Sequence, residues 1–248
     1  MPPDLMFCDE EDWPDVGDET PLKKLAVYLP YKWPGPVRLK VAFIDNPKPP
    51  AGLRGKILGH MNAWGEFCDV HFCESLTGDN PQVRITLEGP RRSSGIGTDI
   101  LGKHWANKPT MRLGNLDVRN ELAFGRSVRH ETGHTLGFKH EHLHPEVVKR
   151  IDHNKAIEYY GRKGWGKART RHNVLTPLPE DAILSSKLDL HSIMCYRIPK
   201  EILKPGAAEI TGGDDISPHD REFAATVYPF PKYKLPVYGH DFPGASLV

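Results

Sequence analysis

The sequence HETGHTLGFKH, from His130 to His140, decides the fold. If its first part is helical, His130 and His134 project from one face, because residues four apart on a helix lie one above the other. Gly137 can adopt the left-handed conformation that ends a helix, and the chain then turns so that His140 joins the first two histidines. Three imidazoles arranged in this way are candidate ligands for a tetrahedral zinc ion whose fourth position stays open.

Three protein ligands and one open position are typical of a catalytic rather than a structural zinc site. Glu131 lies between two of the ligands and can accept a proton from water. In a chain with 13 histidines a bare His-x-x-x-His pair would be weak, but a match at all fixed positions of HExxHxxGxxH is much rarer. His142 and His144 could compete as the third ligand, yet the spacing after Gly137 favours His140.

Helical periodicity surrounds the motif. Asn120 is a suitable N-cap for a helix from Glu121 to about Leu136. One stripe of this helix, which we expect to face a sheet, holds Phe124, Val128, Thr132 and Leu136.

Alternating or apolar runs before the motif predict strands, and helical spacing predicts three further helices. We expect strands at Val37–Ile44, Val70–Cys73, Val83–Leu87 and Thr110–Leu113, with a short edge strand within Gly95–Leu101. The helices are expected from Leu53, at Asn154–Lys163, and after the N-cap Ser217, where Pro218 and Asp220 occupy the first turn.

The charge balance excludes one class of partner. Lys and Arg number 33 against 32 Asp and Glu, so no global field attracts nucleic acid or anionic lipid, and we expect neither partner. No apolar run approaches the roughly 18 residues of a membrane helix, so we expect no membrane association. The N-terminus lacks the basic and apolar regions of a secretory signal.

Four cysteines, Cys8, Cys68, Cys73 and Cys195, form no CxxC pair, which excludes a zinc ribbon or a thioredoxin-like site. Cys68 and Cys73 lie five apart around an expected strand, so their side chains point to opposite faces if that strand is regular. We therefore expect two free thiols.

The sequence SIMCY, Ser192 to Tyr196, resembles the Met-turn that follows this zinc motif in metzincin peptidases. With HExxHxxGFxHE at residues 130–141, it resembles the astacin-like branch. The resemblance implies that Met194 lies beneath the imidazoles and that Tyr196 is a fifth zinc ligand or binds the oxyanion; the alternative for Tyr196 is a packed aromatic. Cys195 stands where the family usually has His.

The same resemblance implies a fold. The fold is α+β and metzincin-like, with a twisted mixed sheet and helices in an upper lobe (about 23–137), a mostly irregular lower lobe (about 138–248), and zinc in a cleft between them. In the family Glu141 meets the N-terminus that activation releases. Residues 1–22 carry Asp, Glu and Pro with little periodicity, so we expect a flexible or regulatory arm there. Inhibition through Cys8 or Asp18 and a merely flexible terminus both stay open.

We therefore expect a monomeric zinc-dependent endopeptidase in which Glu131 is the general base and Tyr196 assists. A polypeptide substrate would add as an extra strand at the edge near Gly95–Leu101. The family resemblance suggests an extracellular location. The rival interpretation is a zinc-stabilised binding module or a catalytically silent relative, and the presence of both Glu131 and Tyr196 argues against it.

The purified protein should hold about one zinc ion per chain, because three neutral imidazoles leave a single tetrahedral site. Metal analysis after dialysis measures this ratio. His134→Ala removes one ligand and should lose the ion, so full zinc retention in that variant would contradict the assignment.

Overall fold

The computed structural model describes residues 31–75, 80–178 and 188–231. The arm predicted at residues 1–22 lies outside these ranges. The strands are β1 (Val37–Phe43), β2 (Val70–Glu74), β3 (Val83–Thr86), β4 (Arg92–Ser94) and β5 (Met111–Leu113). The α-helices are α1 (Ala51–Asn62), α2 (Glu121–Thr135), α3 (Pro145–Val148), α4 (His153–Arg162), α5 (Lys167–Thr170) and α6 (Pro218–Val227). Short 3₁₀ turns cover Ala63–Glu66, Gly97–Leu101, Lys103–Trp105, Glu141–Leu143 and Lys200–Ile202, and a π turn covers Arg171–Leu175.

The strands form one mixed sheet in the order β2-β1-β3-β5-β4. The first three pairings are parallel, with Val37 opposite Val70 and Ile85 opposite Met111, while β4 runs antiparallel to β5. The predicted mixed α+β fold is confirmed. The inward positions of β1 are buried and alternate with exposed ones, which explains why its sequence alternates.

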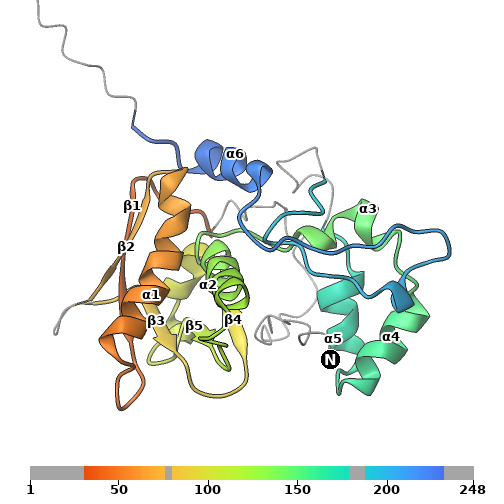
Figure 1. The fold of residues 1–248 in the computed structure, drawn as a ribbon, viewed down its shortest axis with the longest axis horizontal. Coiled ribbons are helices and arrows are strands. Elements are labelled where there is room, and N and C mark those ends of the chain that lie inside the picture. Colours follow the sequence, from red (N-terminus) through yellow and green to blue (C-terminus); the bar gives the residue numbers. More distant parts are fainter. Residues whose placement is uncertain (1–30, 76–79, 179–187, 232–248) are drawn as a thin grey trace, which may run out of the picture.

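Two apolar cores hold the described part of the chain together. The first joins the sheet to α1 and α2, and it contains Phe124, Val128 and Leu136 of the predicted stripe. The second lies under α4 and includes Val147, Tyr160 and Tyr196. In Figure 1 the sheet with α1 and α2 lies on one side of the molecule and α3, α4 and α5 lie on the other.

Helix α6 returns from the second half of the chain to the first core. The predicted N-cap Ser217 is confirmed, and with Asp220 it forms a capping box: the Ser217 hydroxyl accepts from the Asp220 amide, and the Asp220 carboxylate accepts from the Ser217 amide. At its end Tyr228 is buried, and its hydroxyl donates to the Leu136 carbonyl at 2.6 Å and accepts from the Trp33 amide at 3.3 Å. The last helix is thereby bonded to the end of α2.

The predicted edge strand within Gly95–Leu101 is wrong. Residues Gly97–Leu101 form a 3₁₀ turn, and the edge strand is β4, three residues earlier. Gly97 has a φ of +51°, in the left-handed region that a strand cannot use. The Asp99 carboxylate accepts from the Trp105 indole at 2.9 Å, which closes this segment on itself.

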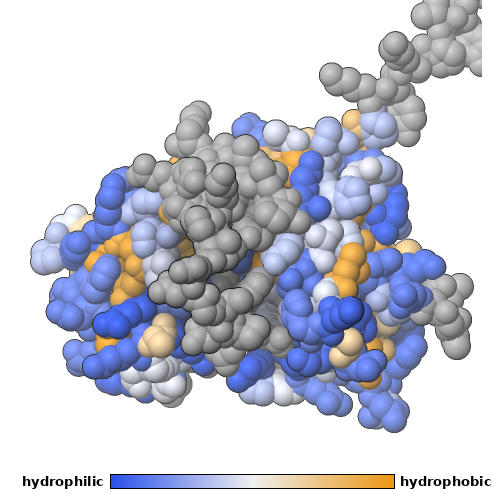
Figure 2. All heavy atoms as spheres, turned by 180° about the vertical axis from the view of Figure 1, so that it is seen from behind, coloured by the Kyte–Doolittle hydropathy of each residue, from blue (hydrophilic) through white to orange (hydrophobic). Residues whose placement is uncertain are grey.

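Cys68, Cys73 and Cys195 are free, as expected for the first two, and Cys8 lies outside the described residues. Cys195 is fully buried. Within the described ranges no helix has the length and apolar character needed to cross a membrane. The face shown in Figure 2 carries mostly hydrophilic residues with small separate apolar patches.

Tyr228→Phe should lower the free energy of unfolding by about 1–3 kcal/mol, because it leaves the buried Leu136 carbonyl without its hydrogen bond. Urea denaturation of both proteins measures the difference. Tyr159→Phe is the matched control, since no hydrogen bond of its hydroxyl is found among the described residues, and it should change stability little. Equal stabilities of the Tyr228 variant and the parent would show that this bond does not hold α6 to α2.

Candidate active site

Helix α2 begins and ends as its sequence predicts. The Asn120 side chain accepts from the Ala123 amide at 3.1 Å. At the other end Gly137 has a φ of +93°. Its amide donates to the His134 carbonyl at 2.7 Å, and the Phe138 amide donates to the Gly133 carbonyl at 2.9 Å. This is the Schellman arrangement, which reverses the chain directly after the helix.

The reversal brings the three predicted histidines together. His130, His134 and His140 are all buried, and one ring nitrogen of each lies within 4.8 Å of the others. Nε2 of His140 is 3.3 Å from Nε2 of His130 and 2.9 Å from Nε2 of His134. A tetrahedral zinc ion with bonds of about 2.0–2.1 Å separates its ligand nitrogens by roughly 3.3 Å, so the spacing fits this ion.

The orientation of the rings also fits a metal. Nδ1 of His130 is 2.7 Å from the Ile193 carbonyl, and Nδ1 of His134 is 2.8 Å from the Phe138 carbonyl. A carbonyl only accepts, so each Nδ1 carries the proton and each Nε2 presents a lone pair. Burial and the two neighbouring histidines hold the pKa of His130 well below its usual value, which keeps the ring neutral.

Glu131 lies on the same buried part of α2 and is 1% exposed. The edge strand passes near it. Burial lowers the pKa of Arg92 on β4, and the charge of Glu131 opposes that shift. The hydroxyls of Ser94 on β4 and Thr135 on α2 are 2.9 Å apart, which joins the edge strand to the zinc-motif helix.

Tyr196 is packed among the histidine rings. Its ring centroid lies 4.3 Å from that of His140 and 5.6 Å from that of His130, with the latter pair stacked at 17°. It also stacks on His142, with ring centroids 4.4 Å apart and planes 19° apart. His142 is itself buried, and its Nε2 lies 2.9 Å from the Asn173 carbonyl, so this competing histidine does not join the cluster. His144, the other competitor, accepts from the Glu146 amide in the helix cap of α3.

Met194 packs against α2 at Gly133. A Cβ built on Gly133 would be 2.4 Å from the Met194 sulfur, so glycine at this position lets the methionine approach the helix between the two histidine ligands. The Met194 carbonyl accepts from the Glu141 amide at 3.0 Å. The segment around Met194 is thus bonded to the chain that carries His140.

Asp220 holds this segment from the far end of the chain. Its carboxylate accepts from the Ser192 hydroxyl at 2.7 Å and from the Ile193 amide at 2.9 Å, and Ser192 in turn accepts from the Met194 amide. Burial raises the pKa of Asp220 above its usual value, while these hydrogen bonds oppose the shift. Asp220 therefore has two roles: it belongs to the cap of α6, and it holds Ile193, the residue whose carbonyl orients His130.

Glu141 lines a small pocket together with Lys139, Ser192, His219 and Phe223. Its carboxylate accepts from the Asp189 amide at 3.2 Å, and burial raises its pKa to about 7. Cys8 and Asp18, the candidates for an inhibitory arm, lie outside the described residues, as does any contact of Glu141 with the N-terminus.

The sequence motif identified every member of the histidine cluster, but not the groups that orient it. The carbonyls of Phe138 and Ile193 carry no sequence signal, because any residue could supply them. The position of Asp220 in the first turn after Ser217 indicated its role at the start of α6. It did not indicate its second role, the hydrogen bonds to Ser192 and Ile193. Arg126, one helical turn before His130, was also missed.

Comparison with known proteins gives relatives among solved structures. No family model and no curated protein matches the chain. One structure of myroilysin is 29% identical, with a TM-score of 0.75 over 83% of this chain and 98% of that one. A second myroilysin structure is 28% identical, with a TM-score of 0.60 over 85% and 92%.

A third structure is High choriolytic enzyme 1, a hatching enzyme zinc-protease from Oryzias latipes. It is 16% identical, with a TM-score of 0.55 over 79% of this chain and 92% of that one, and it shows the shared fold alone. The three-histidine cluster fits one catalytic zinc ion as the cofactor. The motif, the cluster and the fold shared with myroilysin together identify the chain as a zinc metallopeptidase that is similar to the astacin-like branch of the metzincins.

Proposed function

We propose that the chain cleaves internal peptide bonds at the histidine cluster, with Glu131 as general base and Tyr196 as the group that stabilises the oxyanion. The observation that carries the proposal is the convergence of three buried Nε2 atoms beside a buried glutamate on the same helix. His130, His134 and His140 would hold the ion. When bound there, zinc acidifies water and polarises a peptide carbonyl.

Glu131 is the proton carrier in this proposal. It accepts a proton from the attacking water and gives it to the amine nitrogen that leaves, so the carboxylate is regenerated in each cycle. The residue is buried, which excludes competing bulk water from the transfer. Its position directly after the first histidine ligand places it on the helix that the N-cap and the Gly137 turn hold in place.

Tyr196 is the hydrogen-bond donor in this proposal. Its ring packs against the rings of both His140 and His142, so the hydroxyl is held in place before charge develops on the carbonyl oxygen. A donor fixed in advance pays no cost of reorganisation in the transition state.

The substrate would lie along β4 rather than along residues 95–101. β4 is an edge strand of the sheet among the described residues, and its Ser94 is joined to Thr135 beside Glu131. An extended peptide can add to this edge through backbone hydrogen bonds, which are independent of side-chain identity. Polypeptide is therefore the proposed substrate class.

Glu131→Gln should reduce kcat by about 10²- to 10⁴-fold, because the amide keeps the size of the side chain but cannot accept the proton. Zinc content and the thermal melt should not change. Steady-state kinetics on a quenched-fluorescence peptide measures the loss. Glu121→Gln, an exposed glutamate at the start of the same helix, is the matched control and should retain activity. Near-parental activity of the Glu131 variant would mean that another group is the base.

Tyr196→Phe should reduce kcat by about 10²- to 10³-fold with little change in KM, because the hydroxyl acts once charge has formed. Tyr159→Phe is the matched control: it removes a tyrosine hydroxyl from the edge of the same apolar core, outside the site, and should leave kcat unchanged. A raised KM at unchanged kcat would place Tyr196 in substrate binding. Unchanged kinetics would leave it as a packed aromatic.

A further inference from the structure

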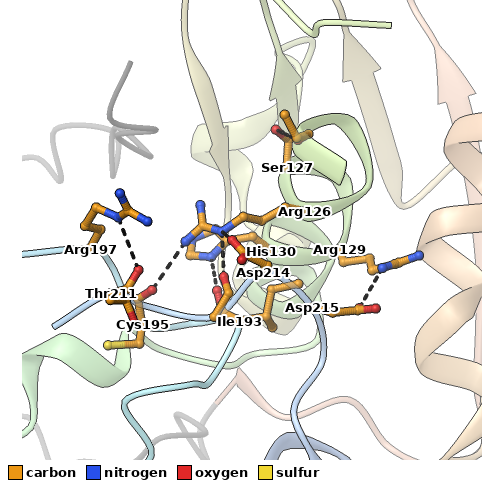
Figure 3. A network of polar contacts seen from close by, with 12 residues as sticks. Arg126, Ser127, Arg129, His130, Ile193, Cys195, Arg197, Thr211, Asp214 and Asp215 are labelled. Atoms are coloured by element: carbon orange, nitrogen blue, oxygen red, sulfur yellow. Dashed lines mark hydrogen bonds and ion pairs between the residues drawn. The ribbon is translucent and has the colours of Figure 1, made fainter. Parts of the chain in front are cut away.

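Arg126 connects the zinc-motif helix to the chain that carries Tyr196. It lies on α2 one turn before His130, and its side chain is 14% exposed. Its Nε donates to the Gly213 carbonyl at 2.6 Å, and one terminal nitrogen donates to the Cys195 carbonyl at 3.5 Å. Figure 3 shows the guanidinium between α2 and these two segments.

The two segments that Arg126 contacts are themselves tightly interlocked. The Gly213 amide donates to the Ser192 carbonyl at 3.0 Å. Gly212 has a φ of +66°, and a Cβ there would be 2.5 Å from the Cys195 carbonyl oxygen. At Gly213 a Cβ would be 2.1 Å from the His191 carbonyl oxygen. Both glycines are required for this approach, so residues 211–213 form a close support beneath residues 191–196.

The charge of Arg126 is compensated within the same network. Its Nε lies 3.9 Å from the Asp214 carboxylate. Burial lowers the pKa of Arg126, and the charge of Asp214 is the largest influence that opposes the shift. The buried guanidinium therefore has both hydrogen-bond acceptors and a counter-ion, as a buried cation requires.

We propose that Arg126 is a positioning residue for Tyr196, because it fixes the Cys195 carbonyl, and with it the peptide bond that leads into Tyr196, against the zinc-motif helix. The inference rests on the proposed role of Tyr196. The fork of the guanidinium reaches two backbone carbonyls at once, which a single ammonium group cannot reproduce. Removing it should shift the Tyr196 hydroxyl relative to the reacting carbonyl while the histidine cluster stays formed.

Arg129 provides a matched comparison on the same helix. It pairs with Asp215 at 2.6 Å and so reaches the same 211–215 segment, and its side chain is 22% exposed. Among the described contacts it does not reach the Cys195 carbonyl. A loss that comes only from loosening this segment should therefore be seen in Arg129→Gln as well.

The test compares Arg126→Gln, Arg126→Lys and Arg129→Gln, each with Tyr196 intact and with Tyr196→Phe. With Tyr196 intact, Arg126→Gln should lower kcat about 10- to 100-fold at nearly constant KM, since misplacement of a reacting group by about 1 Å has effects of this size. Arg126→Lys should retain part of the activity and Arg129→Gln nearly all. In the Tyr196→Phe background the Arg126 variants should change kcat by less than about twofold, because coupled residues are not additive.

A second measurement needs no zinc in the active site. In metal-free protein, hydrogen exchange of the peptide covering residues 192–197 should be faster in Arg126→Gln than in Arg129→Gln, and the lysine variant carries the comparison if the glutamine variant does not fold. Equal losses in both Tyr196 backgrounds, or equal exchange in the Arg126 and Arg129 variants, would overturn the inference. Unchanged kinetics in Tyr196→Phe alone would refute the proposed role of Tyr196 and this inference with it.

Discussion

Two backbone carbonyls determine how the zinc site is presented. The Phe138 and Ile193 carbonyls accept the Nδ1 protons of His134 and His130, which leaves the Nε2 lone pairs to converge with that of His140. Without these acceptors each ring could rotate or change tautomer, and the nitrogens would not hold the spacing that a tetrahedral ion needs. Most of the surrounding structure serves to place the two carbonyls.

The two carbonyls reach the site by different routes. The Phe138 carbonyl comes from the Gly137 turn, within four residues of the ring that it orients. The Ile193 carbonyl comes from a segment far along the chain, which Asp220 fixes to the start of α6 and which Gly133 allows to approach α2. The contact of Tyr228 with Leu136 then joins the end of α6 to the end of α2. The last helix of the described chain is therefore part of the support for the first ligand.

Local patterns could be predicted from the sequence because they depend on neighbouring residues. Asn120, Gly137 and Ser217 begin or end helices through contacts within four residues, and the structure confirms all three. The edge strand could not be placed from the sequence. Residues 97–101 form a turn because Gly97 adopts a positive φ and Asp99 bonds the Trp105 indole, and neither feature changes the pattern of apolar residues. The role of Arg126 was equally hidden, because its partners are backbone carbonyls of residues nearly seventy and ninety positions away.

Anomalous diffraction at the zinc absorption edge, from crystals of the purified protein, tests the central claim most directly. The account predicts one strong peak at about 2.0–2.1 Å from Nε2 of each of His130, His134 and His140. The Nδ1 atoms of His130 and His134 should still face the Ile193 and Phe138 carbonyls. A peak bound through Nδ1, a peak at another set of side chains, or crystals without zinc would contradict it.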